Sequence, residues 1–92
     1  MGNRVRQEVR IERIASGSEA AVIEQALERV ERGDVVVYHR GLAGSAPRSI
    51  KAAAMLLHER GLCLLTQRIT ADRDSAGERI VDYLAIKARV KW

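Results

Sequence analysis

Apolar residues recur at two different spacings along this chain, and the change between the spacings separates helices from strands. Between residues 18 and 32 and between residues 47 and 60, they return every three or four positions, which predicts two amphipathic helices. Gly33 and Gly61 follow these segments, and glycine commonly ends a helix because it adopts a left-handed conformation without steric cost. Residues 34–39 contain an uninterrupted β-branched run, which predicts a strand buried on both faces.

The two ends of the chain follow a period of two instead, which is typical of strands. Residues 4–14 alternate apolar and charged positions and are interpreted as an amphipathic strand, with a helix as the open alternative. Residues 62–69 and 79–91 are expected to form two further strands, joined by the polar loop 70–78. The chain is therefore predicted to end in an antiparallel β-hairpin.

Residues of the last predicted strand point alternately to its two faces, and this alternation assigns each residue to one face. One face, expected to point outward, carries Val81, Tyr83, Ala85, Lys87, Arg89 and Lys91. The other face, expected to cover the helices, carries Ile80, Leu84, Ile86, Ala88 and Val90. Asp82 interrupts this inner row and is expected near the loop, in solvent. Because the strand is longer than its hairpin partner, it needs another neighbour, either residues 4–14 or a second copy of the chain.

The predicted order is strand, helix, strand, helix, strand, strand. It indicates an α+β fold in which two helices accompany a small, mainly antiparallel sheet that ends in the C-terminal hairpin. Residues 1–92 are expected to form a single small domain, in which residues 1–3 and the 70–78 loop are mobile. With 47% hydrophobic residues and no Phe, the core must be aliphatic. The only aromatic residues are Tyr38, Tyr83 and Trp92, so stacking on single-stranded bases has little support.

Charge and cysteine content limit the partners and the compartment. The net charge is +4, from 16 basic and 12 acidic residues, which permits a nucleic-acid partner and equally fits a solvated surface of mixed sign. The lone Cys63 cannot form an internal disulfide, and the N-terminus lacks the apolar core of a signal peptide, so a cytoplasmic location is expected. Uncharged stretches such as residues 52–58 are too short to span a bilayer, so no membrane partner is expected.

Few residues suggest catalysis or metal binding. His39 and His58 are the only histidines, and without a neighbouring thiol or carboxylate pair they predict no metal site. Cys63 lies among leucines, where burial is expected to raise the pKa of its thiol. The sequence contains no recognisable pairing of a nucleophile with a base. The chain is therefore expected not to be an enzyme and to need neither a cofactor nor a metal.

The helix at residues 47–60 is the candidate nucleic-acid-binding element. Its exposed face combines short or flexible side chains with long cations, a combination that allows close approach to a DNA groove. The loop at residues 41–45 lacks the Lys-Ser/Thr pair of a P-loop. Arg40 and Arg48 nevertheless flank a helix N-terminus, whose partial positive charge favours a phosphate. The predicted nucleic-acid-binding residues are Arg40, Arg48, Ser49, Lys51, Ala52, Met55, Arg73, Arg79, Lys87, Arg89 and Lys91.

Other observations weigh against this interpretation. An ordinary solvated helix face carries charges at the same spacing. The predicted loop also contains the acidic residues Asp72, Asp74 and Glu78, which phosphates would repel.

From Asp34 onward, the succession of helix, strand, charged loop and strand resembles winged-helix domains, a common nucleic-acid-binding fold. The resemblance implies that Arg48, Ser49, Lys51, Ala52 and Met55 line the recognition helix and that Arg73 and Arg79 lie on the wing. The chain departs from the winged-helix pattern because only residues 41–46 are available for the helix that precedes the recognition helix.

A second resemblance covers roughly the last 55 residues. The strings at residues 37–43, 60–62, 65–68 and 83–85 look like those of small uncharacterised phage and prophage proteins. This likeness implies an origin on a mobile element and brings no known activity with it.

Two functions from different classes follow. The first is a duplex-DNA-binding module, a regulator on a phage-like element, that uses the 47–60 helix in the major groove and the hairpin cations on the backbone. The second is a small non-enzymatic interaction protein, a homodimer joined through strand edges, without nucleic-acid binding. The basic excess favours the first function, whereas the acidic loop and Glu59 on the helix favour the second.

Overall fold

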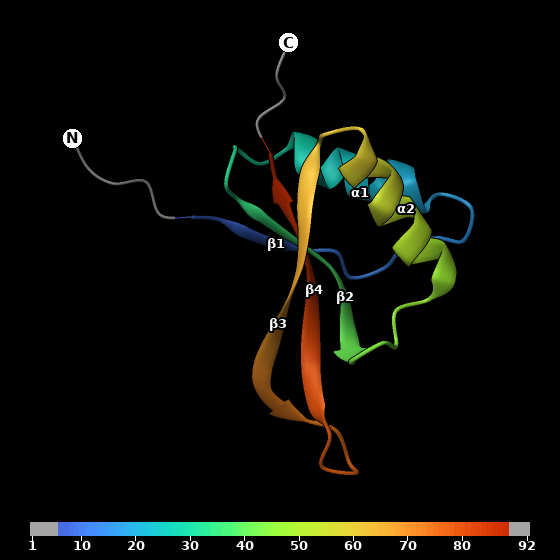
Figure 1. The fold of residues 1–92 in the computed structure, drawn as a ribbon, viewed down its shortest axis with the longest axis vertical. Helices are drawn as coiled ribbons and strands as arrows, with labels where there is room; N and C mark the ends of the chain where they lie inside the picture. Colours follow the sequence, from blue (N-terminus) through green and yellow to red (C-terminus); the bar gives the residue numbers. More distant parts are fainter. Residues whose placement is uncertain (1–5, 89–92) are drawn as a thin grey trace, which may run out of the picture.

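The computed structural model describes residues 6–88 as two helices packed on one side of a four-stranded sheet (Figure 1). The elements are β1 (Glu8–Arg10), α1 (Glu19–Glu28), β2 (Val35–Leu42), α2 (Arg48–Glu59), β3 (Cys63–Arg73) and β4 (Arg79–Lys87). The predicted α+β class is confirmed. Neither helix in this part of the chain is long and apolar enough to cross a lipid bilayer.

The strands lie in the order β1-β2-β4-β3, which makes β4 an interior strand. β1 pairs with β2 in parallel, whereas β4 is antiparallel to both β2 and β3. The predicted neighbour of the last strand was therefore wrong, because β2 fills that place. Within the predicted strand at residues 4–14, only Glu8–Arg10 forms a strand, and residues 4 and 5 lie outside the described residues. The predicted end of the last strand, residues 89–91, lies outside them too.

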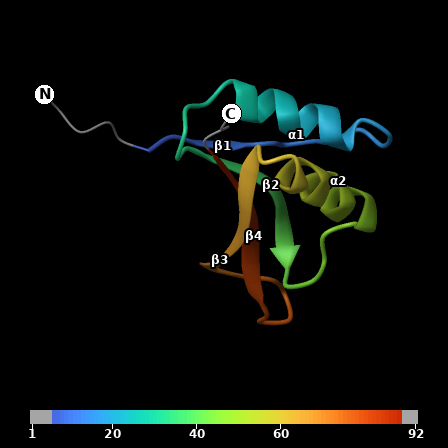
Figure 2. The same ribbon diagram turned by 45° about the horizontal axis from the view of Figure 1, so that its top comes forward.

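The hydrophobic core lies between the helices and one face of the sheet. α1 contributes Ile23, Ala26 and Leu27, and α2 contributes Ala53, Ala54 and Leu57, so the predicted apolar stripes are confirmed. A smaller cluster on the opposite, helix-free face contains Val35, Val37 and Leu84, with Ile86 packed against it. β2 is therefore buried on both faces, as its apolar run predicts. Figure 2 shows the two helices beside each other on the same side of the sheet.

The predicted faces of β4 are reversed in the structure. Val81, Tyr83 and Ala85 pack against the helices, whereas Leu84 and Ile86 lie on the helix-free face. Asp82 also lies there, and only 2% of its surface is exposed, so its expected position in solvent was wrong. Because β4 is interior, both of its faces carry apolar residues, and alternation alone does not say which face meets the helices.

The turns are tighter than the sequence predicts. β2 continues to Leu42, into the predicted loop at residues 40–46, and β3 continues to Arg73, into the predicted loop at residues 70–78. Between the hairpin strands, Asp74 Oδ1 accepts hydrogen bonds from the backbone N–H groups of Ala76 (3.0 Å) and Glu78 (2.8 Å). An aspartate that bonds its following backbone in this way favours a tight turn.

Leu57 and Leu56 are adjacent on α2 but differ completely in burial, which allows a matched test of the core. Leu57 is fully buried, whereas 47% of Leu56 is exposed. Leu57→Ala is expected to lower the free energy of unfolding by roughly 2–5 kcal/mol, since it leaves a cavity. Leu56→Ala is expected to change it by no more than about 0.5 kcal/mol. Urea denaturation followed by circular dichroism measures both, and equal losses in the two variants would contradict this packing.

Candidate nucleic-acid interface

The exposed face of α2 carries two cations at its N-terminal end. Pro47 precedes the helix with φ −56°, and Gly61 follows it with φ +80°, so the glycine ends this helix as the sequence predicts. Arg48 and Lys51 are exposed, and neither side chain forms an ion pair within residues 6–88. Ala52 and Met55 are exposed beside them. The face therefore offers two uncommitted positive charges next to small or flexible side chains.

Ser49 differs from its neighbours because it lies beside an acid from α1. The pKa of Glu19 is lowered, chiefly by hydrogen bonds from its own backbone N–H and from that of Gly17, with a smaller contribution from Ser49. The Gly17 N–H lies 3.1 Å from Glu19 Oε1. One carboxylate therefore stands near the start of α2, and Ser49 is partly engaged with it.

The β3–β4 hairpin extends beyond the helices and carries two further cations near its tip (Figure 1). Arg73 and Arg79 are paired directly opposite each other across the hairpin. Arg73 Nη1 donates a hydrogen bond to the Gly77 carbonyl at 2.7 Å. Since like charges placed opposite each other destabilise a sheet, this pair concentrates positive charge at a small energetic cost.

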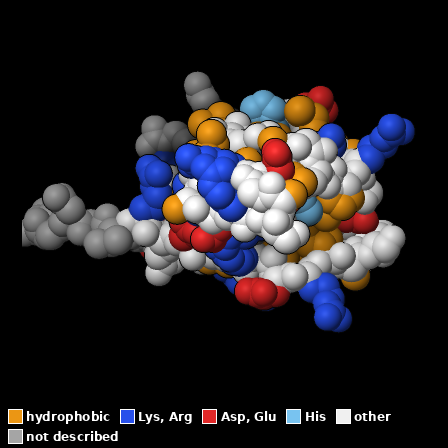
Figure 3. All heavy atoms as spheres, turned by 90° about the horizontal axis from the view of Figure 1, so that it is seen from below, with side chains coloured by type: hydrophobic (Ala, Val, Ile, Leu, Met, Phe, Trp, Pro, Cys, Tyr) orange, Lys and Arg blue, Asp and Glu red, His pale blue; other side chains and the backbone are white. Residues whose placement is uncertain are grey.

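A groove separates α2 from the hairpin. One hollow of about 210 Å³ is lined by Lys51, Met55 and Gln67, among others. A second hollow, of about 530 Å³, is lined by Gln67, Ile69, Arg73 and Arg79, with Leu42 and Glu78 on its wall. Because Gln67 lines both hollows, they adjoin, and we call them together the α2–hairpin groove. Viewed from the hairpin end, the surface shows basic side chains interspersed with hydrophobic and acidic ones (Figure 3).

Tyr83 fixes the loop that leads into α2. Its hydroxyl accepts a hydrogen bond from the Gly44 N–H at 2.6 Å and lies 3.4 Å from the Leu42 carbonyl. A Cβ atom at Gly41 would lie 2.6 Å from Ser45 Oγ, so a larger residue there would displace the Ser45 side chain. The start of α2 is thereby held against β4.

His39 packs beside this loop without forming a metal site. Its ring meets the Tyr83 ring edge-on at a centroid distance of 5.3 Å, and burial lowers its pKa. His58 Nδ1 bonds the Cys63 carbonyl at 2.8 Å, and burial raises the pKa of the Cys63 thiol. Among residues 6–88, no three His, Cys, Asp or Glu side chains lie together in a way that could hold a metal ion.

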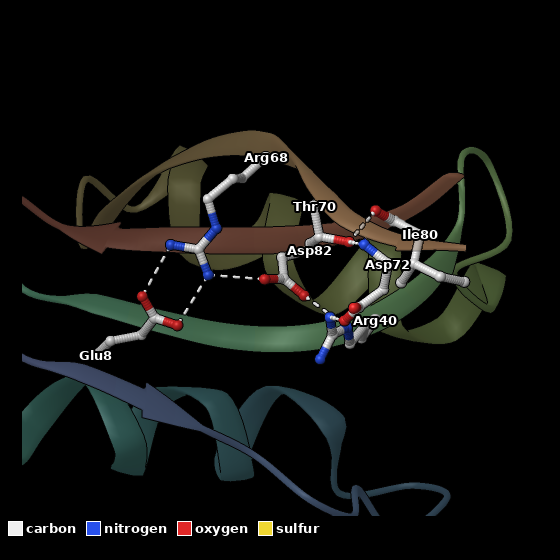
Figure 4. Close-up of polar contacts among 7 residues, drawn as sticks. All are labelled: Glu8, Arg40, Arg68, Thr70, Asp72, Ile80 and Asp82. Atoms are coloured by element: carbon white, nitrogen blue, oxygen red, sulfur yellow. Dashed lines mark hydrogen bonds and ion pairs between the residues drawn. The ribbon is translucent and has the colours of Figure 1, made fainter. Parts of the chain in front are cut away.

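Arg40 lies away from α2, on the helix-free face of the sheet, in a set of ion pairs that we call the Asp82 network. The network comprises Glu8, Arg40, Arg68, Asp72 and Asp82 (Figure 4). Arg40 Nε lies 3.4 Å from Asp82 Oδ1, and Arg40 also pairs with Asp72. Arg68 binds Glu8 with both ends of its guanidinium group, each at 2.8 Å, and donates to Asp82 at 2.7 Å. The hydrogen bonds from Arg68 lower the pKa of Glu8.

The structure brings together some of the predicted residues and separates others. Arg48, Lys51, Ala52 and Met55 lie exposed on α2, where Lys51 and Met55 line the groove, and Arg73 and Arg79 line it on the hairpin. Lys87 is half-buried instead, and its Nζ donates to the Val30 carbonyl at 2.8 Å, just after α1. Arg89 and Lys91 lie outside the described residues.

The sequence interpretation missed Leu42, Gln67 and Ile69, which also line the groove. The alternation of residues 63–69 could have placed Gln67 and Ile69 on one face. It could not have shown that this face lies beside α2.

Comparison with known proteins gives no match to a family model, to a curated protein or to a solved structure. The function is therefore inferred from the contacts and charges of residues 6–88.

Asp72 and Asp82 both pair with Arg40 but differ in burial, which makes them a matched pair for testing the network. Asp82→Asn is expected to lower the free energy of unfolding by about 1.5–3 kcal/mol, since it weakens the hydrogen bond from Arg68 and removes the charge that faces Arg40. Asp72→Asn, at a largely exposed side chain, is expected to cost less than about 1 kcal/mol. Urea denaturation at neutral pH compares them. A loss for Asp82→Asn as small as that for Asp72→Asn would show that the network contributes little.

Proposed function

We propose that this chain binds duplex DNA through the α2–hairpin groove. The observation that carries the proposal is a groove lined by Lys51 from α2 and by Arg73 and Arg79 from the hairpin, with the exposed Arg48 three positions before Lys51 on the same helix. A duplex presents phosphates on two strands, so cations on both sides of a groove suit it better than a single basic stripe.

The acids of the hairpin oppose this function less than their number suggests. Asp72 is paired with Arg40 in the Asp82 network, on the helix-free face. Asp74 accepts two backbone hydrogen bonds within the turn. Glu78 lines the groove together with Arg73 and Arg79, so two cations and one acid face a ligand at the hairpin. The balance there favours an anionic partner.

The two walls of the groove have different roles in this proposal. Arg48 and Lys51 bind backbone phosphates, where the partial positive charge of the helix N-terminus adds to their own. Ala52 and Met55 are small or flexible and face base edges at close range. Arg73 and Arg79 bind phosphates outside the part of the duplex that α2 enters. In the terms of the phage-like resemblance, the protein acts as a regulator.

The winged-helix resemblance supports this assignment in one respect and departs from it in another. α2 leads directly into the β3–β4 hairpin, in the order that suggested the resemblance. Between β2 and α2, however, the chain forms only turns and no helix. The start of α2 is positioned instead by the bond from Gly44 to Tyr83.

A binding titration with random-sequence duplex at low and moderate salt tests the proposal. The affinity is expected to fall steeply as salt rises, because each neutralised phosphate releases condensed counterions. Arg48→Ala/Lys51→Ala is expected to reduce the salt slope by about two units, one for each lost phosphate contact. The matched control is Arg29→Ala/Arg32→Ala, which removes the same charge from exposed positions at and beyond the end of α1. That control is expected to leave the slope unchanged.

Three other outcomes would change the conclusion. No binding of the wild type at low salt would exclude the function, since even non-specific attraction should appear there. An equal loss in both double variants would show that only net charge matters. Unchanged binding in Arg48→Ala/Lys51→Ala, together with loss in Arg73→Ala/Arg79→Ala, would restrict the contact to the hairpin.

A further inference from the structure

β3 is an edge strand whose outer side has no partner strand among the described residues. It runs from Cys63 to Arg73 and pairs only with β4. The other edge strand, β1, spans only Glu8–Arg10. Unpaired backbone N–H and C=O groups on a long edge form a template for another strand. This edge is therefore the part of the sheet most suited to bind a further chain.

The backbone hydrogen bonds show which residues of β3 point outward. The Ala88 N–H donates to the Leu62 carbonyl at 3.0 Å, so Leu62 and every second residue after it face β4. Cys63, Leu65, Gln67 and Ile69 consequently direct their N–H and C=O groups away from the sheet. The Cys63 carbonyl is already bonded to His58. The free stretch of edge is thus Leu65, Gln67 and Ile69, and Gln67 is its centre.

This stretch lacks the usual protection against edge pairing. Natural edges are protected by charged side chains, by proline or by a covering element. Residues 62–67 contain no charge and no proline. Arg68 is the first charged residue of β3. Its side chain extends across the helix-free face towards Glu8 and Asp82, so it does not protect the edge from pairing. In contrast, Ile69 exposes 68% of its surface.

We propose that two copies of this chain pair through their β3 edges, antiparallel and centred on Gln67. In this register Gln67 lies opposite Gln67 of the second copy, and Leu65 lies opposite Ile69 of the second copy. All three outward residues then form hydrogen-bonded pairs. The half-buried Leu65 of each copy covers the exposed Ile69 of the other copy, so this contact forms twice, once on each side of the two-fold axis. Arg68 lies opposite Thr66, so no like charges meet.

Other registers are less favourable. Centring the pair on Arg68 would place two arginines opposite each other, and like charges at opposed positions destabilise a sheet. Centring it on Thr66 would pair Cys63 with Ile69 of the second copy. Cys63 would then have to bond the second copy through a carbonyl that already bonds His58.

The dimer does not depend on DNA binding, and its two-fold axis leaves both α2 helices on the same side of the joined sheet.

The mass in solution, measured by sedimentation from micromolar to millimolar protein, tests the dimer. The wild type is expected to approach twice the mass of the chain. Ile69→Lys is expected to raise the dissociation constant by roughly tenfold or more, since a charge replaces both apolar contacts. Gln67→Pro is expected to act similarly, because it removes an outward N–H without removing a bond to β4. Leu56→Lys, at an exposed leucine on α2, is the control and should dimerise like the wild type.

The register is tested by cross-linking. In a Cys63→Ala background, Gln67→Cys is expected to form a disulfide-linked dimer under mild oxidation, because a hydrogen-bonded pair holds its Cα atoms about 5.5 Å apart. Ala71→Cys, whose two copies lie far apart in this register, is expected to stay monomeric on a non-reducing gel. A monomeric wild type at millimolar concentration would overturn the proposal. Wild-type-like dimerisation of both Ile69→Lys and Gln67→Pro would overturn it too, and cross-linking through Ala71→Cys would overturn the register.

Discussion

The burial of Asp82 is the constraint on which the arrangement of the sheet depends. A carboxylate with 2% of its surface exposed must be neutralised, because an uncompensated buried charge costs several kcal/mol. Arg40 from β2 and Arg68 from β3 neutralise it from both neighbouring strands. Arg68 also reaches Glu8 in β1, at the opposite edge of the sheet, so this ion pair must pass over β2 and β4. The Asp82 network therefore connects all four strands and fixes the hairpin relative to β2.

This constraint divides the charges of the molecule between the two faces of the sheet. On the helix-free face, two arginines and three acids neutralise one another in the Asp82 network. On the helix side, the cations of α2 and of the hairpin have no acid of that network near them. Three acids are thereby held away from the groove, which is lined by Lys51, Arg73 and Arg79 together with one acid, Glu78.

The two edges of the sheet differ for the same reason. β1 is short, which leaves little backbone for another strand, and its Glu8 side chain is held by Arg68. β3 is long, and Arg68 is drawn away from its edge by the same contact. The contact that anchors one edge thereby removes a charge from the other. The proposed self-association through β3 rests on this asymmetry, whereas the length of the last strand, which first suggested self-association, is explained by its interior position.

The sequence by itself determined the elements whose causes are local. Helical spacing located both helices and identified the exposed cations Arg48 and Lys51, and Gly61 marked the end of α2. Gly33 did not mark the end of α1, which already ends at Glu28. Only the tertiary structure decided which face of β4 meets the helices, where Arg40 and Lys87 lie, and that Asp82 is buried. Alternation gives the period of a strand but not its phase, and the phase depends on neighbours that are distant in sequence. Arg68 and Glu8, for example, are separated by 60 residues, so no local pattern records their contact.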